Sequence, residues 1–137
     1  MSALVFTVPG TPSAWKRPAD RARGASGRYD PNAAAKRVVA KYALAARAFA
    51  RESIVRELPV GLRVVCAFAT DDEARWGQPY TPKRRHDADN LVKLVLDALN
   101  GVLYTDDSQV AELEVAKVWA ADASTTVELR ILEVPRG

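Results

Sequence analysis

Four aspartates and a lysine are grouped in the sequence in a way that could support metal-dependent hydrolysis. Asp87 and Asp89 are separated by one residue, Lys93 follows, and Asp106 and Asp107 come a short distance later. Carboxylate oxygens are the ligands that Mg²⁺ prefers, and two or three of them leave coordination positions open for water and a phosphate oxygen. A metal held in this way can activate water and neutralise charge on a transferring phosphate. The group therefore predicts a site for phosphodiester hydrolysis.

These residues need elements that position them. Residues 89–100 carry apolar side chains at helical spacing, so we expect a helix with Asp89 and Lys93 together on its opposite face. Gly101 fits the end of this helix. A chain that turns back after Gly101 could bring Asp107 close to Asp87. The segment 87–107 therefore holds all the elements of the predicted site.

An ordinary structural role for the same residues stays open. Asp is a preferred helix cap, so Asp87 or Asp89 could simply begin the helix. Asp106 and Asp107 could belong to a polar turn, and Lys93 could pair with a neighbouring carboxylate on a solvated face. On this alternative, the chain is a structural or interaction module without affinity for DNA.

The other elements follow from hydrophobic patterning. Apolar runs predict four strands, over residues 4–8, 62–70, 110–119 and 126–134. A further helix is predicted over residues 32–57, with core-facing positions Val38, Tyr42, Ala45 and Phe49. The short connection between the last two strands predicts an antiparallel hairpin. We therefore expect an α/β (α+β) fold, in which a mixed four-stranded sheet and two helices in the order β-α-β-α-β-β form one domain over residues 1–137.

Positive charge gathers in two segments that are predicted to be loops. The net charge of the 137 residues is only +3, but basic residues dominate the region before residue 41 and the four positions before Asp87. The candidate DNA-binding residues are Lys16, Arg17, Arg21, Arg23, Arg28, Lys83, Arg84 and Arg85. Such residues suit phosphates, and they give affinity rather than sequence choice. Trp15, Tyr29 and Trp76 are candidates for stacking on unpaired bases.

Several classes of protein are disfavoured by composition. With one cysteine, Cys66, and one histidine, the chain cannot form an intrachain disulfide and is a poor candidate for a Cys/His zinc site. No run approaches the ~20 apolar residues that span a bilayer. The N-terminus lacks the basic start of a signal peptide. We therefore expect a cytoplasmic protein that does not bind membranes.

The segment from residue 83 to residue 109 resembles the signature of the RusA-like Holliday junction resolvases. That signature is a basic stretch, then D-x-D-N-L-x-K, then D-A-L, a turn, and D-D-x-Q; the sequence here reads KRRHDADNLVKLVLDALNGVLYTDDSQ. The run Val8-Pro9-Gly10 and the following Lys16-Arg17-Pro18 are also similar to the family, as is the order of elements. The resemblance covers nearly the whole chain. The sequence departs from the family pattern in the insert-like segment 71–82.

The resemblance implies which residues would act. Asp87, Asp89 and Asp107 would hold Mg²⁺, with Mn²⁺ as a possible substitute, and Lys93 would be essential. Asp106 is a candidate fourth carboxylate. Asn90 is expected to orient a ligand or to cap the helix.

The resemblance also implies a function and an assembly. The expected activity is resolution of Holliday junctions by paired phosphodiester hydrolysis, in DNA recombination and repair. A homodimer is implied as well, and it suits a four-way junction because two symmetric strands must be cut. The alternative within the same fold is a non-catalytic protein that binds branched DNA.

Overall fold

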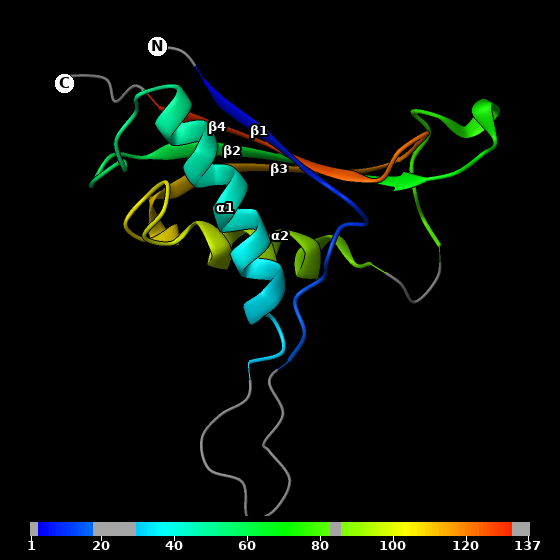
Figure 1. The fold of residues 1–137 in the computed structure, drawn as a ribbon, viewed down its shortest axis with the longest axis horizontal. Helices are drawn as coiled ribbons and strands as arrows, with labels where there is room; N and C mark the ends of the chain where they lie inside the picture. Colours follow the sequence, from blue (N-terminus) through cyan, green and yellow to red (C-terminus); the bar gives the residue numbers. More distant parts are fainter. Residues whose placement is uncertain (1–2, 18–29, 83–85, 133–137) are drawn as a thin grey trace, which may run out of the picture.

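The structure is a computed structural model, and it describes residues 3–17, 30–82 and 86–132. The principal elements are β1 (Leu4–Pro9), α1 (Ala33–Phe49), β2 (Val60–Ala69), α2 (Ala88–Leu99), β3 (Val110–Ala120) and β4 (Ser124–Ile131). Two short 3-10 helices, η1 (Glu73–Arg75) and η2 (Asp107–Gln109), lie in the connections. The predicted fold class is confirmed, because the elements follow the expected order and form a mixed four-stranded sheet with two helices (Figure 1).

The order of strands in the sheet is β1-β4-β2-β3. β4 pairs antiparallel with β1 and with β2, whereas β2 and β3 run parallel. The predicted hairpin between the last two strands is therefore wrong, since β2 lies between them. The connection 121–123 is long enough to cross the roughly 10 Å between strands that are not neighbours. β2 lies inside the sheet, between β4 and β3, a position that suits a strand that is apolar along most of its length.

The β2-α2-β3 unit fixes the direction of α2. Because β2 and β3 are parallel, the helix that connects them must run back along the sheet. The N-terminal end of α2 consequently lies toward the carboxyl ends of these strands, and its C-terminal end lies near the start of β3 (Figure 1). Residues that flank α2 in the sequence are thus placed at opposite ends of the sheet.

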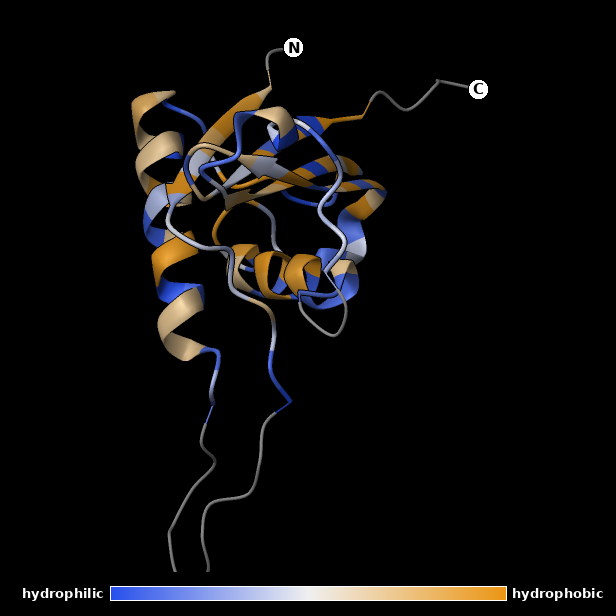
Figure 2. Ribbon diagram, turned by 90° about the vertical axis from the view of Figure 1, so that its right-hand side faces the viewer, coloured by the Kyte–Doolittle hydropathy of each residue, from blue (hydrophilic) through white to orange (hydrophobic). Residues whose placement is uncertain are grey.

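The core lies between the sheet and α2. Alternate residues of β2 are buried: Val60, Leu62, Val64, Cys66 and Phe68. They meet the apolar face of α2, which consists of Leu91, Val92, Leu94, Val95, Ala98 and Leu99. Figure 2 shows this face as an orange stretch of α2 below the sheet. The predicted amphipathic helix is therefore confirmed, and its polar face is left to solvent.

α1 packs against β1 and α2, and of the predicted core-facing side chains only Tyr42 packs against the core. Its buried residues are Val39 and Ala43, whereas Val38 is 46% exposed and Phe49 is 94% exposed. Val39 and Ala43 each lie one position after the predicted Val38 and Tyr42. One position corresponds to a turn of about 100° around the helix axis, so the predicted buried face was misplaced by that angle. The helix also ends at Phe49, well before residue 57, and Arg51 follows with a left-handed φ of 57°.

No helix in the described part of the chain is long and apolar enough to cross a membrane.

Candidate functional site

Asp87, Asp89 and Lys93 lie at the N-terminal end of α2, on its solvent-facing side. All three are exposed, whereas Leu91 and Leu94 between and beyond them are buried. The helix thus buries its apolar face against β2 and presents two carboxylates and one ammonium group together to solvent. This part of the predicted site is assembled by one turn and a half of helix.

Asp87 begins α2 without capping it. It occupies the N-cap position with an extended backbone (φ −61°, ψ 136°), but its side chain makes no capping hydrogen bond. Within the described residues, the carboxylates of Asp87 and Asp89 make no hydrogen bond or ion pair. A purely structural capping role therefore does not account for Asp87, and both carboxylates have lone pairs available for a cation.

Lys93 lies over the indole ring of Trp15. Its Nζ atom is 3.7 Å from the ring centroid, within the range of a cation–π interaction. The backbone N–H of Trp15 donates to the carbonyl of Asn90 at 2.8 Å, which fixes the segment after β1 against the first turn of α2. Trp15 thus holds the ammonium group of Lys93 at the same end of the helix as Asp87 and Asp89. The predicted role of the Asn90 side chain stays a prediction.

The segment that carries Lys16 and Arg17 is held by a buried asparagine. Asn32 is 2% exposed, and its side chain accepts from the backbone N–H of Lys16 at 2.7 Å and donates to the Lys16 carbonyl at 2.8 Å. Asn32 stands at the start of α1 but its side chain makes no capping bond there. The amide therefore fastens the polar segment before residue 18 to the start of α1.

Asp106 is engaged in the turn before β3. It caps η2 by accepting from the backbone N–H of Ser108 at 3.0 Å, and Gln109 completes a capping box with it. Hydrogen bonds from the side chain and backbone of Ser108 hold the pKa of Asp106 below its usual range. The predicted alternative of a polar turn thus describes Asp106 well.

Asp107 differs from its neighbour. It is half-buried in the first position of η2, and its carboxylate makes no hydrogen bond or ion pair within the described residues. Gln109, two positions later, donates to the carbonyls of Val55 and Leu58 and so anchors this turn to the segment before β2. Asp107 is thus held in an anchored turn, and its carboxylate has no hydrogen-bond or ion-pair partner among the described residues.

Three carboxylates surround Tyr104 at this end of α2. The Tyr104 side chain is buried, and its hydroxyl donates to the carbonyl of Leu96 at 3.0 Å. Burial, together with the nearby negative charges of Asp107, Asp97 and Asp106, raises the pKa of Tyr104 above its usual range. Asp97 of α2 therefore belongs to the acidic group that contains Asp106 and Asp107.

The two acidic groups lie at opposite ends of α2. Asp87 and Asp89 stand at its start, while Asp107 follows its end and precedes β3. The 12 residues of α2 extend over about 18 Å. In the described part of the chain, no group of three or more His, Cys, Asp or Glu side chains is close enough to hold a metal ion. The fold of one chain thus does not bring Asp107 to the other two aspartates, and the three-aspartate site stays a prediction.

A second lysine lies beside Asp87. The Nζ atom of Lys117 donates to the carbonyl of His86 at 3.1 Å. Lys117 is in register with Cys66 of β2, so its side chain is on the inner face of the sheet with Val115 and Trp119. Lys117 is not among the residues predicted for the site. The sequence does contain a hint: Lys117 occupies one of the alternate strand positions that point to the apolar face, where a cation is unexpected.

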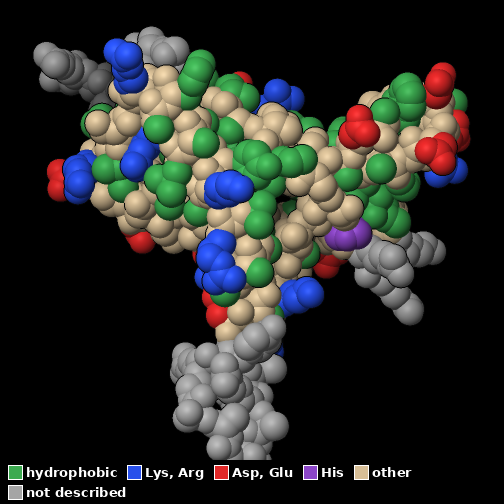
Figure 3. Space-filling model, viewed as in Figure 1, with side chains coloured by type: hydrophobic (Ala, Val, Ile, Leu, Met, Phe, Trp, Pro, Cys, Tyr) green, Lys and Arg blue, Asp and Glu red, His purple; other side chains and the backbone are tan. Residues whose placement is uncertain are grey.

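The predicted DNA-binding residues are only partly within the described structure. Lys16 and Arg17 are exposed, whereas Arg21, Arg23, Arg28, Lys83, Arg84 and Arg85 lie outside the described residues. Figure 3 shows further lysine and arginine side chains along α1, and acidic ones gathered over the segment that contains η1. The view agrees with a positive surface on the α1 side of the molecule.

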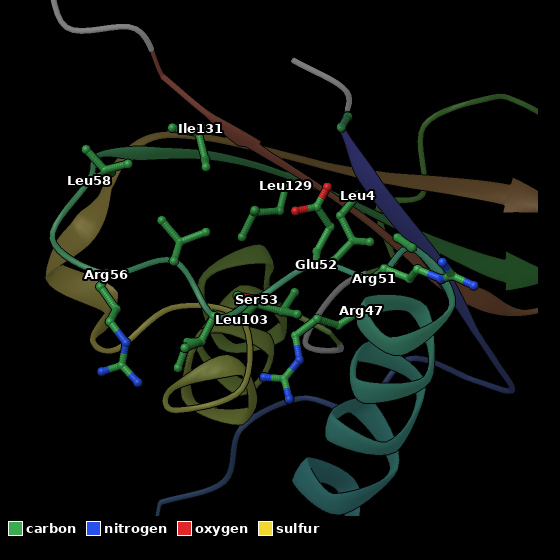
Figure 4. Close-up of a pocket in the computed structure, with 14 residues that line it drawn as sticks. Leu4, Arg47, Arg51, Glu52, Ser53, Arg56, Leu58, Leu103, Leu129 and Ile131 are labelled. Atoms are coloured by element: carbon green, nitrogen blue, oxygen red, sulfur yellow. The ribbon is translucent and has the colours of Figure 1, made fainter.

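A separate cavity of about 310 Å³ lies between the end of α1 and the edge of the sheet (Figure 4). Arg47, Arg51 and Arg56 line it together with apolar side chains such as Leu103 and Leu129. Arg47 donates to the carbonyl of Val102 at 2.6 Å. None of the residues of the predicted site lines this cavity, so it is distinct from both acidic groups.

The chain is thus a small α+β protein. At the start of α2 it exposes two carboxylates, Asp87 and Asp89, that have no hydrogen-bond partner among the described residues, and Lys93 and Lys117 lie nearby. Residues 9–130 match the family described as endodeoxyribonuclease RusA. The chain belongs to this family. It is 35% identical to the crossover junction endodeoxyribonuclease of Lactococcus phage r1t over 85 residues, which cover 61% of this chain and 62% of the phage protein. It is also 31% identical over 139 aligned positions to the protein YqaN of Bacillus subtilis, covering 95% of this chain and 97% of YqaN.

Proposed function

We propose that this protein is a divalent-metal-dependent endonuclease that resolves four-way DNA junctions by paired phosphodiester hydrolysis, in DNA recombination and repair. The observation that carries the proposal is that the carboxylates of Asp87 and Asp89 make no hydrogen bond with the described residues, at the start of the helix that also carries Lys93. The chain belongs to the RusA family. The name of the phage relative, a crossover junction endodeoxyribonuclease, gives the substrate class.

The donor atoms at this site fit a hard cation. They are carboxylate oxygens on exposed or half-buried side chains without protein partners in the described structure. Such donors suit Mg²⁺, and Mn²⁺ would serve as a substitute. Asp87, Asp89 and Asp107 would hold the ion. A bound ion of this kind would lower the pKa of a water molecule and neutralise charge on the scissile phosphate.

The protein's own residues supply the remaining functions. Lys93 carries the positive charge that would bind a phosphate oxygen, and the ring of Trp15 lies against that charge. Lys16 and Arg17, on the segment anchored by Asn32, would bind neighbouring phosphates. The basic residues outside the described structure are proposed to extend this surface.

A homodimer would complete the site. A carboxylate at the start of α2 and one beyond its end cannot share a single ion within one chain. A twofold axis that places two α2 helices antiparallel would bring Asp87 and Asp89 of one copy to Asp107 of the other. Two equivalent sites would then serve the two opposed strands of a junction. We therefore propose that each metal site is built from both copies.

Cleavage of a synthetic four-way junction tests the function, with a linear duplex of the same sequence as the control substrate. The wild type should make paired symmetric cuts in the junction with Mg²⁺ and none with EDTA. Asp89→Asn should lose at least about 100-fold in rate, since loss of even an outer partner of a metal site costs 10- to 100-fold. Asp122→Asn, in the exposed turn before β4, is the matched control and should cut normally.

Two outcomes would overturn the proposal. Tight junction binding without cuts under any metal would favour a non-catalytic binding protein. Full activity of Asp89→Asn with Mg²⁺ would remove the assignment of this carboxylate.

A further inference from the structure

The residue before Asp87 has an unusual backbone conformation. His86 has a φ of 56°, in the left-handed region that non-glycine residues rarely adopt. Such a conformation is unfavourable by itself and persists where surrounding contacts hold it. Because the peptide bond from His86 leads directly into Asp87, this conformation sets the direction in which the chain enters α2.

Three side chains hold His86 in place: Phe68 of β2, Tyr80 six residues earlier in the chain, and Lys117 of β3. The hydroxyl of Tyr80 is hydrogen-bonded to Nδ1 of His86 at 2.9 Å, and the imidazole ring packs against Phe68 with centroids 4.7 Å apart. Lys117 binds the carbonyl of His86 at 3.1 Å. Both the side chain and the carbonyl of His86 are therefore fixed, and that carbonyl belongs to the same peptide group as the Asp87 nitrogen.

Tyr80 is itself rigid. It is 6% exposed, its ring stacks on Phe68 with centroids 3.8 Å apart, and Trp119 contacts it edge-on at 4.6 Å. Its backbone N–H donates to the carbonyl of Lys117 at 3.0 Å. A tyrosine packed in this way presents its hydroxyl at one position only.

The segment 71–82 brings Tyr80 to this position. Gly77 donates to the carbonyl of Trp119, and Trp119 donates back to Gln78, so the segment pairs with the second half of β3. This is the part of the chain that departs from the family pattern. It contacts β3, Phe68 of β2 and His86, which gives the segment a structural role next to the predicted site.

We propose that the segment 71–82 positions Asp87, because its Tyr80, together with Lys117, holds His86 in the left-handed conformation that orients the Asp87 backbone. Asp87 makes no capping bond, so the placement of its carboxylate depends on that backbone. Tyr80 and Lys117 are thus positioning residues for the metal site. This inference rests on the proposed function, since it concerns the carboxylate that would bind the metal.

Removing the Tyr80 hydroxyl tests the proposal with little change in packing. Tyr80→Phe keeps the ring stack on Phe68, and Tyr42→Phe, which removes a hydroxyl from α1, is the matched control. Tyr80→Phe should raise the Mg²⁺ concentration for half-maximal junction cleavage about tenfold. It should also require about tenfold more Mn²⁺ for the same rise in Tm without DNA, because ligand stabilisation scales with the ratio of concentration to Kd. Junction affinity in EDTA should equal that of the wild type.

Substitution of His86 tests the role of its backbone conformation. Asparagine tolerates the left-handed region better than alanine. His86→Asn should therefore retain more of the wild-type Mn²⁺ response than His86→Ala. In the His86→Asn background, Tyr80→Phe should have no further effect, since the hydrogen bond to the imidazole is already absent.

The results separate this inference from the function on which it rests. If the wild type shows neither metal-dependent cleavage nor a rise in Tm with Mn²⁺, the proposed function fails, and the inference fails with it. If the wild type shows both and Tyr80→Phe has the same metal requirement as Tyr42→Phe, only the positioning role is overturned. Equal responses of His86→Asn and His86→Ala would likewise reject it.

Discussion

Mixing two inactive variants tests whether each metal site is shared between two copies of the chain. Asp89→Asn removes a carboxylate at the start of α2, and Asp107→Asn removes one beyond its end. In a dimer of one copy of each, a shared site would receive either both substitutions or neither. One site of every mixed dimer would therefore be intact.

The separation of these carboxylates gives the reason for the expectation. Asp107 lies near Tyr104 together with Asp97, and Asp97 is eight residues along α2 from Asp89, which corresponds to about 12 Å of helix. Ligands of one Mg²⁺ lie at ~2.1 Å from it, so two oxygens on the same ion are at most about 4 Å apart. In the described part of the chain, no three His, Cys, Asp or Glu side chains lie close enough together to hold a metal ion. We therefore expect that Asp89 and Asp107 of one chain do not hold the same ion.

The expected recovery of cleavage activity follows from the way in which the two variants associate into dimers. Random association of equal amounts gives about half mixed dimers, each with one of two sites intact, so about one quarter of wild-type sites should return. The assay is nicking of a four-way junction with Mg²⁺ after co-expression of the two variants with different tags. Because only one site per dimer is intact, single nicks should exceed paired cuts. Each variant alone should be at least about 100-fold less active than the wild type.

Absence of recovery would refute the reasoning. If each site lay within one chain, both sites of a mixed dimer would carry one substitution, and mixing would leave the activity unchanged. Isolation of the mixed dimer through its two tags ensures that such a result is not a failure of association. A monomer by analytical ultracentrifugation, with wild-type cleavage intact, would refute the shared site as well.

Three further predictions concern stability and reactivity. Asn32→Ala should lower the free energy of unfolding by about 2 kcal/mol, since it removes two hydrogen bonds to the Lys16 backbone, each worth about 1 kcal/mol. Urea unfolding measures this change. An equal loss in the exposed control Asn100→Ala would contradict the prediction. Asp106→Ala should destabilise the protein at neutral pH but keep its Tm response to Mn²⁺. Because the pKa of Asp106 is lowered in the folded state, its carboxylate contributes stability above its unfolded-state pKa. That contribution is lost as the pH falls through its folded-state pKa. A difference in stability between Asp106→Ala and the wild type that does not change with pH would be inconsistent with this. Burial raises the pKa of the Cys66 thiol to about 11, so iodoacetamide at about pH 8 should modify it slowly in the native protein and rapidly in urea, whereas fast native labelling would argue against burial.

Local patterning was sufficient to predict α2 and the side chains at its start. The spacing of Leu91, Leu94 and Val95 defines one apolar face, and a helix with such a face must direct Asp89 and Lys93 away from the core. The same kind of reasoning failed for α1, where alanines at many positions make neighbouring faces similar in hydrophobicity. The fully buried residues are Val39 and Ala43, one position beyond the predicted Val38 and Tyr42, and Phe49 is exposed.

The sequence by itself determined the fold class, the family and the amphipathic helix that carries Asp87, Asp89 and Lys93, because these depend on spacing along the chain. Only the tertiary structure decided where Asp107 lies. The parallel pairing of β2 and β3 forces α2 to run back along the sheet, so the two aspartate groups occupy its opposite ends. Tertiary structure also decided the neighbours of Asp87, since Tyr80 lies on a segment that pairs with β3 and Lys117 is a residue of β3 that contacts His86. Strand pairing joins residues far apart in the sequence, and local periodicity carries no information about which strands will be neighbours.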